Sequence, residues 1–390
     1  MPEAPNPSAP VLRVETITDF KAFLDLRDIW DRLVDEAGVD HPFLSHDWVR
    51  IWWECFGKGK ELHILVISDG EEPVALIPLM ITSSRMYGIG VRQLEFIYNS
   101  HTPRCDFIVS RYPIDTCRAV WRYLNEIGNI WDVVKLPQLT LESQTLRTLQ
   151  EMAREDEFLV GCWPSTESPY LTLTGTWDDY LGSLDRKHMS NIRNRLKRLR
   201  KMGNVEFEVV STGADVARSL EAGLEIEAMA WKSRAGTAIL CRPDLIEFYQ
   251  KIALRASERG WLRLDFLTLN GRKIAFDYSL RYKNKHYVLK PGYDPEFAPL
   301  SPYNSLCYLM LRDAFESGVS ECDFLGMKDD WKLNWTGATR PHCWLYIFSD
   351  RLRSTLLHYA KFRLLPELKR FRWYRMLRDT GARMFHPDYS

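Results

Sequence analysis

Apolar and polar positions follow two different periods along the first half of the chain. Alternation with a period of two predicts strands, and apolar residues three or four positions apart predict amphipathic helices. Asp69-Gly70, between two alternating runs, is a hairpin signal. The pattern predicts strands and helices in the ranges 11–16 (strand), 19–37 and 47–56 (helices), 62–68, 74–82, 94–98 and 106–109 (strands), 114–127 (helix), 131–136 (strand) and 142–155 (helix).

A similar order of elements recurs in the second half. The predicted elements are 205–210 (strand), 215–231 and 243–259 (helices), 262–269, 273–282 and 285–293 (a strand meander), 302–316 (helix), and 321–325 and 342–348 (strands). Aligning the two hairpins places Gly70 on Gly271 and, after a slip of one residue, Ala75 on Ala275. The matched order predicts an α/β (α+β) fold of two tandem units, each with a mixed central sheet flanked by helices.

The chain of 390 residues is long enough to bury such cores without disulfides or structural metals. We expect a leader at 1–10, a first unit at 11–165, a linking strand and basic helix at 166–204, a second unit at 205–349 and a basic helical tail at 350–390.

Charge is distributed unevenly, although 52 Lys and Arg balance 52 Asp and Glu. Residues 185–201 contain eight Lys and Arg and one acidic residue, a net charge of +7. Residues 351–390 contain ten Lys and Arg and three acidic residues, again +7, so the rest of the chain carries −14. A uniformly basic protein is thereby excluded, whereas local attraction of an anionic partner is not.

Several classes of protein are disfavoured by what the sequence lacks. No apolar run reaches the length of a membrane-spanning helix, and the first residues do not resemble a signal peptide, so we expect a cytoplasmic protein. The eight cysteines form no CxxC pair and are expected to be small buried residues, with no metal bound. Phosphate-loop, nucleophile-elbow and HExxH motifs are absent, which disfavours triad and zinc hydrolysis.

A strand, loop and helix in the second half form the strongest candidate site. The strand 285–290 is expected to break at Pro291-Gly292, and a helix to begin at Ser301-Pro302 with Ser301 as its cap. Free backbone N–H groups at such a helix start favour a phosphate or pyrophosphate. A strand that separates there exposes backbone groups with which a pantetheine arm can pair.

The order of elements resembles the GNAT acyltransferase fold, and specifically its CelD/BcsL-like branch, which is similar to Fem-type peptidoglycan aminoacyl transferases. The residues that carry the resemblance are spread over about 43–348. They are PYLTL followed by a Trp-Asp-Asp-Tyr-Leu helix, the basic run 187–200, Ala230-Trp231-Lys232 with Gly236, Phe248-Tyr249, Asn270-Gly271 with Ile274-Ala275, Gly292-Tyr293-Asp294, Ser301-Pro302, Asp323-Phe324 with Gly326, and Trp331-Lys332.

The resemblance implies an N-acyltransferase whose second unit binds acetyl-CoA or a longer acyl-CoA, with a degenerate first unit. The residues that it places at the donor are Lys290, Gly292, Ser301, Tyr303, Asn304 and Ser305. One departure concerns Tyr303, because the family usually has a glycine after the Ser-Pro, where backbone lies against the pyrophosphate.

Acyl transfer to an amine needs a proton acceptor, a donor for the thioester oxygen and an acid for the leaving thiol. The resemblance gives Lys332 an electrostatic role. Strand alternation points either Asp277 or Tyr278 into the cleft, and Asp277 is the candidate base. Tyr293 is the candidate acid, although packing explains it equally well. The residues assigned to the acceptor are Trp231, Tyr249 and Tyr278, for which a core role is the alternative.

We therefore expect acyl transfer to an amine of a small molecule, a sugar nucleotide or an envelope polysaccharide precursor. The alternatives are aminoacyl transfer from charged tRNA and a non-catalytic binding protein. The tail, written as two basic amphipathic helices separated at Pro366, suits peripheral association with an anionic membrane through 351–385, or docking onto the protein. The basic helix 185–202 is either a half-buried connector or a clamp for an anionic ligand.

Overall fold

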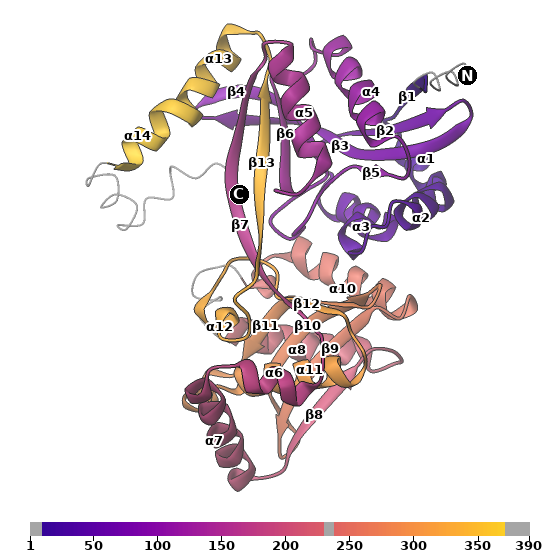
Figure 1. Ribbon diagram of the computed structural model, residues 1–390. Coiled ribbons are helices and arrows are strands. Elements are labelled where there is room, and N and C mark those ends of the chain that lie inside the picture. The colour runs from indigo at the N-terminus through magenta and orange to yellow at the C-terminus, as the bar shows by residue number, and fades with distance from the viewer. Residues whose placement is uncertain (1–9, 230–237, 371–390) are drawn as a thin grey trace, which may run out of the picture.

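The computed structural model describes residues 10–229 and 238–370. Its strands form a mixed sheet in which the order is β1-β2-β3-β4-β6-β13-β7-β12-β11-β10-β9-β8, with β5 beside β3. Figure 1 shows two lobes, each with helices against its part of the sheet. The predicted fold class, two tandem α/β units, is confirmed. No helix in the described ranges is long and apolar enough to cross a bilayer.

The first unit is built from five helices, one 3-10 turn and the strands up to β7. Their bounds are β1 Leu12–Ile17, α1 Phe20–Asp25, α2 Arg27–Glu36, η1 Pro42–Leu44, α3 His46–Phe56, β2 Glu61–Asp69, β3 Glu72–Met86, β4 Ile89–Phe96, β5 Ile108–Val109, α4 Pro113–Glu126, β6 Val133–Thr140, α5 Gln144–Glu155 and β7 Leu159–Thr172. The single helix expected over 19–37 is two helices that meet at Leu26.

The second unit follows a similar order. Its elements and those of the tail are α6 Trp177–Ser183, α7 Arg186–Met202, β8 Val205–Val210, α8 Val216–Met229, η2 Ile239–Cys241, α10 Pro243–Glu258, β9 Leu262–Leu269, β10 Arg272–Tyr282, β11 Lys285–Tyr293, η3 Pro295–Leu300, α11 Pro302–Glu316, β12 Glu321–Asp323, α12 Asp330–Leu333, β13 Thr339–Phe348, α13 Leu352–Tyr359, η4 Ala360–Leu364 and α14 Leu365–Arg370.

Two long strands connect the units, and one of them differs from the sequence-based division. The strand expected at 342–348 was assigned to the second unit, but β13 pairs with β6 and β7 in the first part of the sheet. β7 extends from the first unit into the second, where its last residues, Tyr170 to Thr172, pair with β12. Figure 1 shows β7 and β13 side by side between the lobes. The predicted end of the second unit at residue 349 therefore does not coincide with the division of the sheet, because β13 belongs to the first part.

The tail begins as a helix that packs on the first unit. The expected separation at Pro366 is not seen, because α13 continues through the π-helical turn η4 into α14, which contains Pro366. Proline lacks an N–H, and a π-helical turn just before it shifts the hydrogen-bonding pattern that proline interrupts. The tail is helical over 352–370, and residues 371–390 lie outside the described residues.

The core crosses the boundary between the units. Trp48 and Phe56 on α3 contact Phe248 on α10, with ring centroids 5.3 and 5.2 Å apart. Both helices contribute to one cluster of buried apolar side chains. Because the two units share this cluster, the first unit supports the scaffold on which the second unit's site is built.

Candidate functional site

β11 and β12 separate within the second unit, and the candidate site lies where they do so. The parallel pairing joins only Lys285–Tyr287 to Glu321–Asp323. On its other side β11 stays paired with β10 through Tyr293, with a register shift opposite Tyr278 and Ser279. The prediction that the strand breaks at Pro291-Gly292 is therefore wrong in detail: the strand continues, and the gap opens because β12 ends.

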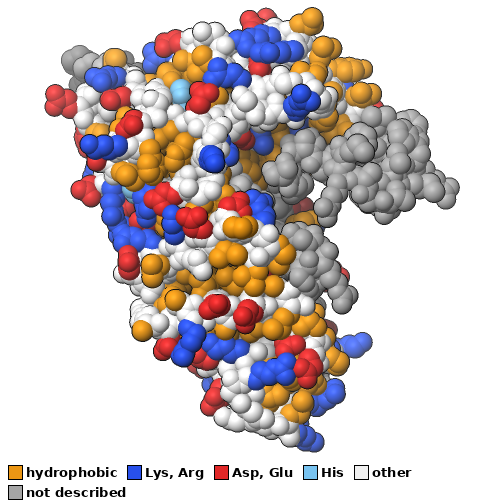
Figure 2. All heavy atoms as spheres, turned by 180° about the vertical axis from the view of Figure 1, so that it is seen from behind, with side chains coloured by type: hydrophobic (Ala, Val, Ile, Leu, Met, Phe, Trp, Pro, Cys, Tyr) orange, Lys and Arg blue, Asp and Glu red, His pale blue; other side chains and the backbone are white. Residues whose placement is uncertain are grey.

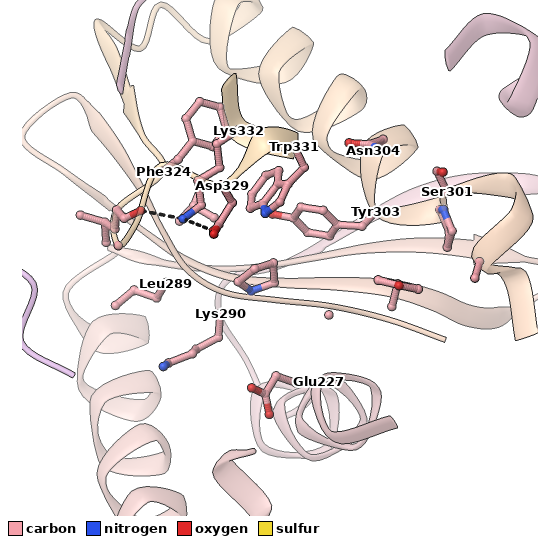
Figure 3. Close-up of a pocket in the computed structure, with 18 residues that line it drawn as sticks. Glu227, Leu289, Lys290, Ser301, Tyr303, Asn304, Phe324, Asp329, Trp331 and Lys332 are labelled. Carbon is pink, nitrogen blue, oxygen red and sulfur yellow. Dashed lines mark hydrogen bonds and ion pairs between the residues drawn. The ribbon is translucent and has the colours of Figure 1, made fainter. Parts of the chain in front are cut away.

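A pocket of about 520 Å³ occupies this gap. Its walls are β11, the start of α11, the segment from Phe324 to Lys332, and α8 (Figure 3). Seven residues predicted from the sequence line it, namely Lys290, Gly292, Tyr293, Ser301, Tyr303, Asn304 and Lys332. The structure thus brings together residues from three separate segments of the chain.

The start of α11 presents backbone N–H groups at the pocket. The first turn of a helix leaves such groups without intrahelical partners, and here Pro302 occupies the first position, followed by Tyr303 and Asn304. Ser301 stands at the cap position, but it has a left-handed backbone (φ 44°) and its side chain makes no capping bond. Its predicted capping role is therefore wrong. Asn304 Oδ1 is buried without a hydrogen-bond partner among the described residues.

Tyr303 points into the core of the unit. Its ring packs edge-on against Trp331, with centroids 5.1 Å apart, and its hydroxyl donates to the carboxylate of Asp277. Burial, followed by the charge of Asp277, raises the pKa of the Tyr303 hydroxyl well above its usual value. Figure 3 shows the side chain turned toward Trp331 and away from Ser301. The large residue that replaces the expected glycine therefore leaves the helix start facing the pocket.

Asp277 does not line the pocket. It is completely buried on β10 and accepts hydrogen bonds from the hydroxyls of Ser279 and Tyr303. Its link to the pocket is the hydrogen bond from Tyr303, which lines the pocket. Because Asp277 itself is absent from the pocket wall, the structure offers no direct support for Asp277 as the base.

Glu227 on α8 is a pocket carboxylate that the sequence analysis missed. It is 1% exposed, it lines the pocket, and its Oε2 accepts the backbone N–H of Ile239 at 3.2 Å. Leu220, Gly223, Leu224 and Glu227 share the buried side of α8. A carboxylate on the apolar side of an amphipathic helix is the signal by which it could have been found.

Gly292 is held directly against the α8 backbone. A Cβ atom on Gly292 would lie 2.7 Å from the Cα and 2.9 Å from the backbone nitrogen of Glu227. Backbone atoms cannot move aside as a side chain can. Only glycine therefore lets α8 approach β11 closely enough to place Glu227 at the pocket.

Lys332 fixes the loop that follows β12. Its ammonium donates to the carbonyl oxygens of Leu325 and Met327 at 2.9 and 2.8 Å, and it pairs with Asp329 at 3.1 Å. The residue is 7% exposed and forms part of the pocket wall. Its observed contacts make it first of all a support of this loop (Figure 3).

Two of the three aromatic residues assigned to the acceptor, Tyr249 and Tyr278, are core residues. Tyr249 and Tyr278 are completely buried, and burial raises the pKa of both hydroxyls. The Tyr278 hydroxyl donates to the carbonyl of Tyr249 at 3.3 Å. Ser305 is also buried outside the pocket lining, and Trp231 lies outside the described residues.

Tyr249 nevertheless connects the pocket to the first unit. The ammonium of Lys290 lies 5.4 Å from the centre of its ring, and its hydroxyl oxygen is 2.9 Å from Nδ1 of His101. Burial lowers the pKa of the His101 imidazole to about 2. A neutral histidine from the first unit therefore supports the aromatic ring beneath Lys290.

The corresponding gap in the first unit is closed by backbone. β4 and β6 pair in parallel only over Gln93–Glu95 and Val133–Lys135. Beyond them the backbone N–H of Cys105 donates to the carbonyl of Gln138 at 3.2 Å, and Arg104 is buried beside it. A backbone hydrogen bond therefore bridges the two segments beyond this parallel pairing.

Comparisons with known proteins concern the range of the second unit and the fold of the whole chain. Residues 186–333 match the family model described as acetyltransferase (GNAT) domain. The second unit is therefore similar to a GNAT acetyltransferase domain. No curated protein sequence gave a significant match.

Two solved structures cover most of the chain. FemX is 13% identical with a TM-score of 0.58, covering 88% of this chain and 100% of FemX. L-PGS from Bacillus licheniformis is 13% identical with a TM-score of 0.51, covering 86% of this chain and 96% of L-PGS. At such identities the likeness supports the fold alone, and it extends over both units.

Proposed function

We propose that this protein transfers an acyl group from an acyl-CoA, such as acetyl-CoA, to an amine. The observation that carries the proposal is the pocket at the separation of β11 and β12, which meets the start of α11 inside the range similar to a GNAT acetyltransferase domain. An open strand edge can pair with an amide-rich pantetheine arm, and a helix start attracts phosphate.

The donor would lie along β11 with its phosphates at the N–H groups of Tyr303 and Asn304. The inward orientation of Tyr303 supports this placement, since the side chain packs on Trp331 and does not cross the helix start. Lys290, above the ring of Tyr249, supplies a positive charge in the same pocket.

The reaction needs few groups. The acceptor amine gives a proton to the Glu227 carboxylate and forms a C–N bond with the thioester carbon, whose oxygen is polarised by backbone N–H groups of β11 near 290–292. The C–S bond then breaks, and the thiolate takes a proton from the Tyr293 hydroxyl. Glu227 thus replaces Asp277 as the proposed base, and Asp277 and Lys332 become positioning residues.

The acceptor is proposed only as an amine of a small molecule, a sugar nucleotide or an envelope polysaccharide precursor. The first alternative is aminoacyl transfer from charged tRNA. The second is that the protein binds a ligand without catalysing a reaction. All three hypotheses use the same pocket. They differ in whether the protein consumes a thioester, an aminoacyl ester or neither.

A peripheral contact with an anionic membrane is proposed for the tail. Leu352, Leu356 and Tyr359 lie along one side of α13 and are 77%, 54% and 60% exposed. Large exposed apolar residues along one side of a helix favour a bilayer surface. Replacing all three with serine should abolish co-sedimentation with phosphatidylglycerol vesicles, and unchanged partitioning would exclude the membrane contact.

Release of the free thiol of CoA tests whether the protein is an acyltransferase. Calorimetry with acetyl-CoA and octanoyl-CoA measures donor binding, and a thiol reagent measures turnover with a panel of amines. Glu227→Gln should keep donor binding and lose turnover by about 100-fold or more. If neither CoA ester produces heat, a thermal shift or thiol release, the acyl-CoA proposal is wrong.

A further inference from the structure

The helix α7 carries a strip of cations that the candidate site does not use. None of its eight basic side chains forms an ion pair within the described ranges, whereas arginines elsewhere in the second unit, such as Arg263 and Arg281, are paired. All but the half-buried Arg195 are exposed. The members of this strip are Arg186, Lys187, Arg193, Arg195, Lys197, Arg198, Arg200 and Lys201.

Helix stability does not explain the strip. Arg186 and Lys187 occupy the first turn of α7, which contains no acidic residue. Cations at the positive end of the helix dipole are unfavourable. Attachment of the helix comes instead from Met189, Ile192, Leu196 and Leu199, which are buried on the opposite side. The cations are therefore free to serve a partner.

The strip begins beside the candidate site. The ring of His188 lies 5.1 Å from that of Trp335, two residues after the end of α12, which forms part of the pocket wall. α7 also packs against η3 and α11, which contribute Ala298 and Tyr303 to the pocket wall. Figure 1 places α7 at the lower left, and Figure 2, turned by 180° about the vertical axis, shows Lys and Arg side chains along the matching lower right rim.

A groove of about 650 Å³ runs between α6 and α7. Leu181, Leu184 and Met189 contribute apolar atoms to it, and Arg186 and Arg193 lie at its edge. Helical spacing puts Lys197 on the same side as Arg193. Asp178, Ser190 and Asn194 also line the groove, so its surface is mixed polar and apolar, with cations among its walls.

Carboxylates limit the strip on both sides. Asp178 and Asp179 are exposed on α6, and Glu206 is exposed on β8, just after α7. A nucleic acid that extends past the helix would meet these negative charges. An acidic helix about as long as α7 would face eight cations and few carboxylates, namely Asp178 in the groove and Asp185 at the helix cap, so charge complementarity favours a small acidic helical protein.

We propose that α7 docks an acidic acyl carrier protein, which delivers its acyl group on a phosphopantetheine arm to the pocket. The inference rests on the proposed acyl transfer and names its donor. The carrier's thioester is attacked as the CoA thioester would be: the C–S bond breaks, the amide forms and the pantetheine thiol leaves protonated. Only one phosphate then reaches the start of α11, since the adenosine 3′,5′-bisphosphate portion of CoA is absent.

The test measures binding apart from turnover. The probe is a purified bacterial acyl carrier protein bearing a non-hydrolysable octanoyl-phosphopantetheine amide, followed by fluorescence anisotropy. The variant Arg186→Glu/Arg193→Glu/Lys197→Glu should bind it about tenfold more weakly or worse. The control Lys21→Glu/Lys58→Glu/Arg122→Glu makes the same change of charge at exposed first-unit positions that form no ion pair within the described ranges, and should bind like the wild type.

The outcomes separate the two proposals. Loss of carrier binding in the α7 variant, with thiol release from octanoyl-pantetheine unchanged, supports the docking site. Equal binding by both triple variants, or no binding by the wild type at low salt, overturns it. Tighter binding of tRNA that the α7 variant loses would also overturn it, in favour of RNA. Carrier binding without release from any thioester would leave docking intact and count against the acyltransferase.

Discussion

Arg104 of the first unit and Asp323 of the second are joined across the boundary by a buried ion pair of 2.5 Å. Arg340 holds the same carboxylate oxygen at 2.7 Å. The other oxygen accepts the backbone N–H of Leu325 at 2.8 Å. Since Leu325 lines the pocket, the first unit helps to set the loop on which the site depends.

Replacing Arg104 with Met should therefore damage both stability and the site. Removing one partner of a buried pair costs about 3–5 kcal/mol of unfolding free energy, and we expect the lower end of that range because Arg340 still holds Asp323. Chemical denaturation measures that loss, and KM for the thioester should rise because the loop at Leu325 loosens. The control Arg92→Met breaks the exposed pair with Glu61 and should cost less than about 1 kcal/mol. Equal losses in the two variants would show that the boundary pair has no special role.

Gly292→Ala tests the contact between β11 and α8. The added methyl group would meet the backbone of Glu227 at 2.7 Å, so α8 must move and carry Glu227 away. We expect a loss of about 1–3 kcal/mol in stability and a larger loss in turnover than in donor binding. Gly182→Ala is the matched control, because nothing lies within 4 Å of its added Cβ atom in α6. If Gly292→Ala turned over at the normal rate, the reaction would not depend on the position of Glu227 that Gly292 sets.

The sequence predicts most elements well where one face is buried and the period is clear. It does not predict that β13 joins the first part of the sheet, because the local pattern of an apolar strand does not specify its neighbours. The same limit applies to Asp277. Alternation shows that Asp277 and Tyr278 face opposite sides of β10, yet helices and strands cover both sides, so each is buried.

The sequence predicts those parts of the site that lie close together along the chain. It does not predict the residues that reach the pocket through packing between distant segments. The strand and the helix start at Ser301-Pro302 are neighbours in sequence, so the sequence predicts these two walls of the pocket. Glu227 reaches it from a helix more than sixty residues earlier, and only the close approach at Gly292 places it there. His101 and Arg104 come from the other unit, and no motif in the second unit points to them.

Acid should destabilise the protein through its buried histidines, and His101 offers a clear test. Burial lowers the pKa of its imidazole to about 2, whereas an unfolded histidine titrates near about 6.5. Below that pH the unfolded state binds a proton that the folded state does not, so the free energy of unfolding falls as pH falls. His101→Asn should reduce the slope between pH of about 6 and 4 by about one proton in urea titrations. An unchanged slope would mean that His101 is protonated in the folded protein.

Lys332→Met separates a supporting role from a catalytic one. The substitution keeps the apolar stem but removes the donor to Leu325 and Met327 and the partner of Asp329, so two buried carbonyl groups lose their hydrogen bonds at a cost of about 1–3 kcal/mol. The loop should loosen, and the fluorescence of Trp331, whose ring lies 5.5 Å from the ammonium, should change without substrate. Lys328→Met, which breaks only the exposed pair with Glu167, should leave both unchanged. If Lys332→Met keeps wild-type stability and fluorescence yet loses turnover, Lys332 acts on the reacting groups and not through the loop.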